Sequence, residues 1–114
     1  MASLAKSTQF TNLNATGQNV TAGIAMIVSM VITNAQGASA WISLYDLGDQ
    51  SKVTIGTTVP ALTVNLAANT TLNVRFDPGW AIDKGLSVFS TTTDPANGGN
   101  TGSSNGVHGQ FWVN

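Results

Sequence analysis

Apolar and polar residues alternate along most of the chain, and the alternation is clearest in its middle. Two runs, 61–66 and 71–76, place Leu, Val and Phe on one side and mostly Thr, Asn and Arg on the other. Because successive side chains of a strand point to opposite faces, each run predicts a strand with one buried face. The connection 67–70, which contains Asn69, is short enough for the two strands to form a hairpin.

Similar patterns elsewhere predict an all-β chain. Val, Ile, Thr, Phe, Trp and Tyr make up 39 of the 114 residues, and Glu, a strong helix former, is absent. Further strands are expected at Thr8–Leu13, Gly23–Thr33, Ser39–Tyr45, Leu86–Thr92 and Val107–Val113, with room for a short one at Lys52–Ile55. Six to eight short strands separated by Gly, Asn, Pro and Asp turns predict an antiparallel β-sandwich, either jelly-roll or immunoglobulin-like.

The sandwich is expected to fill most of the chain. We assign residues 20–114 to a single β-sandwich domain, and residues 1–19 to an N-terminal arm and first strand. Within the first part, Met1–Gln9 is polar apart from Leu4 and is the stretch expected to form the arm. Long loops are expected at Asp46–Pro60 and Thr93–Asn105, and the second has few apolar residues to hold it in place.

The segment Gly23–Thr33 is apolar on both faces. One face carries the larger side chains, Ile24, Met26, Val28, Met30 and Ile32, and the other carries Ala25, Ile27, Ser29, Val31 and Thr33. Six of these eleven residues are β-branched, which favours a strand over a helix. We expect the larger face to meet the opposing sheet and the smaller face, with Ile27 and Val31, to meet another subunit.

Charge is scarce and argues against two classes of partner. The chain has 8% charged residues and a net charge of −1, whereas an average soluble protein has about 25% charged residues. Without a basic excess to neutralise phosphates, nucleic acid is not an expected partner. The longest apolar stretch, Val20–Ile32, is interrupted and is shorter than the ~20 residues that span a bilayer, so no membrane association is expected either.

Candidate catalytic and metal-binding residues do not form a recognisable motif. Ser103, Ser104, His108 and Asp94 could be drawn as a triad, but no strand-turn-helix nucleophile elbow surrounds either serine. The paired acids, Asp46 with Asp49 and Asp77 with Asp83, lack the spacing of a calcium loop, and Asp is common in turns. We therefore expect no enzymatic activity, no metal and no cofactor.

Aromatic residues are the more informative candidates for binding. Trp41 and Tyr45 alternate with Ile42 and Leu44, so they are expected to turn outward, where a loop, a protein partner or a sugar ring could cover them. Trp112 shares a strand face with His108, and Trp80 follows a Pro-Gly turn. The residues expected at interfaces are Leu4, Lys6, Ile27, Val31, Trp41, Tyr45, Trp80, His108 and Trp112.

From about residue 20 to residue 113 the sequence resembles small virion proteins of tailed phages. The pattern is an aromatic-bearing strand that ends in Leu-Tyr-Asp, then a loop, Gly-Thr, Pro and an alternating strand, followed by an aromatic residue, Gly and a Gly-Leu-Ser segment. The matching residues are Leu44, Tyr45, Asp46, Gly56, Thr57, Pro60, Leu62, Val64, Leu66, Phe76, Gly79, Gly85, Leu86, Ser87 and Val88. These residues are structural and carry no chemistry of their own.

The resemblance implies a capsid decoration, or cement, protein that bridges major capsid subunits and stabilises the shell. Such a protein is made in the host cytoplasm and lies on the outer capsid surface of the virion, often as a homotrimer. Two alternatives remain open: a tail or fibre subunit, and a host-adhesion module that binds carbohydrate.

Overall fold

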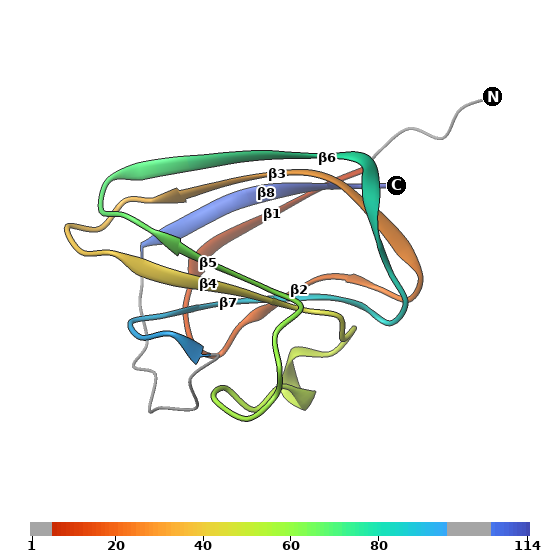
Figure 1. Ribbon diagram of the computed structural model, residues 1–114, viewed down its shortest axis with the longest axis horizontal. Helices are drawn as coiled ribbons and strands as arrows, with labels where there is room; N and C mark the ends of the chain where they lie inside the picture. The colour runs from red at the N-terminus through yellow and green to blue at the C-terminus, as the bar shows by residue number, and fades with distance from the viewer. Residues whose placement is uncertain (1–5, 96–105) are drawn as a thin grey trace.

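The computed structural model describes residues 6–95 and 106–114, which form two four-stranded antiparallel sheets packed face to face (Figure 1). The elements are β1 (Lys6–Leu13), β2 (Gln18–Ala22), β3 (Ala25–Asn34), β4 (Ala40–Tyr45), the 3₁₀ turn η1 (Gln50–Lys52), β5 (Leu62–Leu66), β6 (Thr70–Ile82), β7 (Gly85–Thr91) and β8 (Val107–Val113). Sheet A has the order β1-β8-β3-β6 and sheet B the order β2-β7-β4-β5. The predicted β-sandwich is thus confirmed.

The strand order distinguishes between the two expected types of sandwich. Sheet A takes the first, eighth, third and sixth strands, and sheet B takes the second, seventh, fourth and fifth. Two interleaved Greek keys of this kind make a jelly roll, not an immunoglobulin-like fold. Consecutive strands therefore lie mostly in opposite sheets, and β4 with β5 is the neighbouring pair that stays in one sheet among the eight described strands.

The predicted hairpin at 67–70 is wrong. β5 is an edge strand of sheet B and β6 an edge strand of sheet A, so the connection between them crosses the sandwich. Alternation cannot reveal this, because a strand buries one face equally well in a hairpin and in a crossover. The alternation itself is present, since Leu72 and Val74 are more buried than their neighbours along β6.

Other local predictions also differ from the structure. The short strand expected at Lys52–Ile55 is absent: Asp49 caps η1, accepting hydrogen bonds from the backbone N–H and hydroxyl of Ser51 at 2.9 and 2.7 Å. In contrast, β2 is a strand that the alternation does not predict. The assignment of residues 1–19 as arm and first strand ends inside β2, and Lys6–Gln9, expected in the arm, pair with β8 as part of β1. Residues 1–5 lie outside the described residues.

A bulge in β3 changes which side chains face the core. Between Ile27 and Ser29 the pairing with both neighbouring strands shifts, so the inward positions change from odd to even residue numbers. Met30 and Ile32 are buried as expected, but Ile27 is also buried, and Ile24 and Met26 are 87% and 37% exposed. The expectation that one uninterrupted face of this segment meets the opposing sheet is therefore wrong at its N-terminal end.

The core lies between the two sheets and receives buried side chains from each of the eight described strands. Its fully buried aromatic residue from β8, Phe111, packs against Phe10 of β1 with ring centroids 5.6 Å apart. Close packing of this kind leaves the outer faces of the sheets and the two ends of the sandwich as the surfaces available for binding.

At one end of the sandwich, a buried asparagine joins two crossover connections. Asn34, at the end of β3, is fully buried, and its amide nitrogen donates to the carbonyl oxygens of Ala38, Leu66 and Ala67 at 2.9, 3.1 and 3.2 Å. Its side-chain oxygen accepts from the backbone and side-chain nitrogens of Gln36 at 3.1 and 3.0 Å. The β3–β4 and β5–β6 connections, side by side at the left of Figure 1, are thereby held together.

At the opposite end, a carboxylate holds the turn between β6 and β7. The carboxylate of Asp46 accepts hydrogen bonds from the backbone N–H groups of Asp83, at 3.1 Å, and Lys84, at 2.9 Å. Partial burial alone would raise the pKa of Asp46, but backbone donors from Lys84, Asp83 and Gly85, together with the Lys84 charge, hold it below its usual value.

This pKa shift predicts a pH dependence of stability. Because the folded-state pKa of Asp46 lies below that of the unfolded chain, its contribution is present above the unfolded pKa and is lost as pH falls through the folded pKa. Asp46→Asn should lower the free energy of unfolding at pH 7 by about 1 kcal/mol, allowing for solvent screening, with the difference vanishing in acid. Urea unfolding between pH 2 and 7 measures this. Asp77→Asn, exposed on β6, is the control, and equal effects of the two substitutions would contradict the assignment.

Candidate functional site

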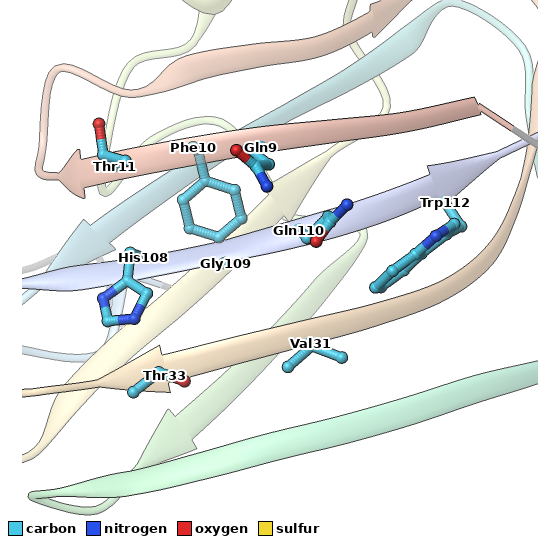
Figure 2. A pocket seen from close by; sticks show the side chains of 9 residues that line it. All are labelled: Gln9, Phe10, Thr11, Val31, Thr33, His108, Gly109, Gln110 and Trp112. Atoms are coloured by element: carbon cyan, nitrogen blue, oxygen red, sulfur yellow. The ribbon is translucent and has the colours of Figure 1, made fainter.

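The outer face of sheet A carries a hollow over β1, β8 and β3. Its volume is about 320 Å³, and none of its nine lining residues is Asp, Glu, Lys or Arg (Figure 2). Three of the residues expected at interfaces line it together: Val31, His108 and Trp112. The hollow thus brings together three of the nine residues expected at interfaces.

Strand register arranges this face in three rows. Trp112 of β8 pairs with Ser7 of β1 and Ser29 of β3. In the next row Gln110 pairs with Gln9 and Val31, and in the third His108 pairs with Thr33. Because residues two apart on a strand share a face, Trp112, Gln110 and His108 follow one another along β8 on the solvent side.

Gly109, one of the residues that line the hollow, leaves room for an aromatic ring next to the strand backbone. Gly109 of β8 pairs with Phe10 and Ile32, and a Cβ at this position would lie 2.8 Å from the Phe10 ring and 2.3 Å from the carbonyl oxygen of Val31. Phe10 is 3% exposed and belongs to the core, yet it also lines the hollow. The floor therefore consists of strand backbone and a buried ring.

The loop between β4 and β5 lies against the outer face of the other sheet. The Ser87 hydroxyl donates to the Leu47 carbonyl oxygen at 2.6 Å, and the Gln50 N–H donates to the Asn19 side chain at 2.8 Å. These bonds tie the loop to β7 and β2 on the outward side of sheet B, and Figure 1 shows it folded beneath that sheet.

Tyr45 lies on the outward face of sheet B, as predicted, but is covered there. It is 1% exposed and packs edge-on against Phe89, with ring centroids 5.3 Å apart. Burial raises the pKa of its phenol. A loop, a protein partner and a sugar ring were the covers considered for these two aromatic residues, and for Tyr45 the cover is the chain itself. Trp41, on the same outward face, stays partly exposed.

The remaining predicted interface residues are dispersed. Ile27 lies in the core because of the β3 bulge, and Trp80 pairs with Ile27 and packs against Phe76 with ring centroids 5.7 Å apart. Lys6 is exposed at the end of β1, and Leu4 lies outside the described residues. Ser103 and Ser104, considered for a triad, and most of the loop expected at 93–105 also lie outside them.

A second hollow, at one end of the sandwich, measures about 380 Å³ and includes the predicted interface residue Lys6. Ile24 and Val113, which also line it, were not predicted as interface residues. The ends of β1 and β8 meet β3 here: the N–H of Met26 donates to the carbonyl oxygen of Asn114 at 3.0 Å, and the N–H of Asn114 donates back at 2.8 Å. Gly23, just before Ile24, was the available sequence signal that the chain turns at this point.

Comparisons of the chain with protein-family models, with curated proteins and with solved structures found no match. Within residues 6–95 and 106–114, no group of three or more His, Cys, Asp or Glu side chains is placed to hold a metal ion. The same residues contain no helix with the length and hydropathy needed to cross a membrane. The geometry of the two hollows is therefore the basis for a functional proposal.

Proposed function

We propose that this chain is a structural virion protein of the capsid decoration type, which assembles with copies of itself and bridges major capsid subunits on the outer surface of the shell. The observation that carries the proposal is the exposed apolar end of the sandwich, where Ile24 is 87% and Met26 37% exposed. Burying a large aliphatic side chain contributes about 1.5–3 kcal/mol, so an uncovered one favours contact with a partner.

Three further features support this proposal. The net charge of −1 leaves little repulsion between neighbouring copies. The jelly-roll strand order is one that viral capsid domains use, although fold analogy alone does not establish function. The resemblance to small tailed-phage virion proteins extends over most of the sandwich.

Avidity would be the mechanism of binding. In a trimer, three modest contacts act together, because effective concentrations in the millimolar range make the second and third contacts intramolecular. A protein that binds only the assembled lattice stabilises that lattice by mass action. Lys6 lies beside Ile24 at the exposed apolar end of the sandwich, so the start of β1 would contribute to the contact.

Ile24→Lys is expected to abolish assembly. The substitution places a charge in the proposed contact, and we expect the free protein to sediment as a monomer at micromolar concentration and its occupancy on expanded phage heads to fall at least tenfold. Val59→Lys is the matched control, because Val59 is 86% exposed on the β4–β5 loop. Sedimentation velocity and co-sedimentation with heads that lack the protein measure both effects.

A wild-type protein that is monomeric and does not bind heads would overturn the proposal. If the Ile24 variant assembles and occupies heads like the wild type, the exposed apolar end is not the contact surface. A tail or fibre subunit would share the fold and composition, and tracing the chain in a cryo-EM map of the virion distinguishes these positions.

A further inference from the structure

The hollow on sheet A combines apolar surface with hydrogen-bonding side chains and contains no Asp, Glu, Lys or Arg. Trp112 and Val31 offer apolar surface, Gln9 and Gln110 offer amides that can donate and accept hydrogen bonds, and His108 offers imidazole nitrogens. Among the described residues, the side chains of Gln9, Gln110 and His108 make no hydrogen bond within the protein. These polar groups are therefore available to a ligand.

The tryptophan is oriented as a wall of the hollow. Figure 2 shows the indole of Trp112 nearly edge-on to a view of the sheet, so the ring stands out from the strands and turns one face toward the side of Gln110. His108 lies beyond Gln110 along the same strand. Trp112 and His108 are four positions apart in an extended strand, a distance of about 14 Å.

We propose that this hollow binds a neutral carbohydrate, at the scale of a disaccharide. The apolar C–H face of a pyranose ring packs on the electron-rich face of the indole. The amides of Gln110 and Gln9, adjacent in the strand register, each offer donors and an acceptor to neighbouring hydroxyl groups. The volume of about 320 Å³ is in the range of small-ligand pockets.

Other occupants fit this surface less well. A peptide that binds by strand addition would pair along the free edge of β1, the edge strand of sheet A, and would lie beside the hollow, which extends over the face of β8 and β3, inner strands paired on both sides. An anionic ligand needs cationic partners, and the nearest cation in the Trp112 row is Arg75 on β6, beyond Ser29. A neutral ligand with many hydroxyl groups satisfies the amides without requiring a charge.

The test is a titration of ¹⁵N-labelled protein with cellobiose, maltose, lactose and N,N′-diacetylchitobiose, followed by backbone and indole chemical shifts. Concentrations up to about 20 mM saturate a site with a Kd of about 1 mM. At least one sugar is expected to produce saturable shifts confined to β1, β8 and β3. Trp112→Ala should weaken that binding at least tenfold, and Gln110→Ala several-fold, with the spectrum of each variant showing that it remains folded.

Trp41→Ala is the matched control, because Trp41 is a partly exposed tryptophan on the outward face of sheet B. The affinity of this variant for the sugar should be unchanged. No saturable shift with any of the four disaccharides overturns the proposal, as does equal weakening by the two tryptophan substitutions. If Trp112→Ala dissociates an oligomer while the wild type ignores sugars, the hollow belongs to a second copy, which also overturns it. Capsid decoration does not depend on this site, so its test can fail or succeed independently.

Discussion

Asn34→Ala is expected to lower the free energy of unfolding by about 3 kcal/mol, because it leaves buried hydrogen-bonding groups without partners. The side chain is fully buried and serves three carbonyl oxygens and two nitrogens of Gln36. For a domain of this size the loss corresponds to a fall in Tm of about 10–15 °C. Urea unfolding followed by tryptophan fluorescence measures the change.

Asn34→Asp separates the hydrogen-bonding role of this side chain from its shape. The carboxylate has nearly the same size but cannot donate to the carbonyl oxygens of Ala38, Leu66 and Ala67, so at pH 7 its destabilisation should match or exceed that of alanine. Asn73→Ala, at an exposed position on β6, is the control and should change stability by less than about 0.5 kcal/mol. An aspartate variant as stable as the wild type would show that shape alone matters.

Gly85→Ala is expected to destabilise the protein by about 3 kcal/mol or more, or to prevent folding. Gly85 has a φ of +130°, and a Cβ there would lie 2.6 Å from both the Cα of Gly48 and the carbonyl oxygen of Thr21. Both obstacles are backbone atoms, so no side-chain rotation can relieve the overlap. The β4–β5 loop and the end of β2 would have to move away from the start of β7.

Two other glycines separate the cost of backbone strain from the cost of steric overlap. Gly23 has a φ of +81°, and a Cβ there would meet no atom within 4 Å, so Gly23→Ala should cost only the backbone strain, about 1 kcal/mol. Gly37 has open space and no positive φ, and its substitution should be nearly neutral. Denaturant midpoints of the three variants give the comparison, and a Gly85 variant no less stable than the Gly23 variant would refute the argument from close approach.

Alternation predicts most of the strands but not their partners. The runs at 61–66 and 71–76 do form strands, since each must bury its leucines and valines, yet burial of one face is satisfied in either sheet. The partner is fixed by contacts such as those of Asn34 with Leu66 and Ala67, between residues more than thirty positions apart. Sequence spacing contains no signal for such contacts.

The candidate site is predictable only in part for the same reason. His108 and Trp112 share a face of one strand, so alternation places them together, but it cannot show that Val31 and Gln9 lie beside them across the sheet. Tyr45 turns outward as expected but is buried, whereas Ile27, expected at an interface, lies in the core because the β3 bulge changes exposure without changing the alternating pattern. Alternation places Ile24 in the core, but in the structure Ile24 is exposed because it lies in the connection between β2 and β3, which begins at Gly23.

The position of β8 in sheet A has a consequence for biogenesis. This strand is the last of the eight in chain order, yet it lies between β1 and β3. During synthesis on the ribosome, β1 and β3 therefore have no strand between them until β8 has left the exit tunnel. Sheet A can form completely only after β8 has been translated. Long-range pairing of this kind slows folding, which gives nascent chains time to expose unpaired strand edges to one another.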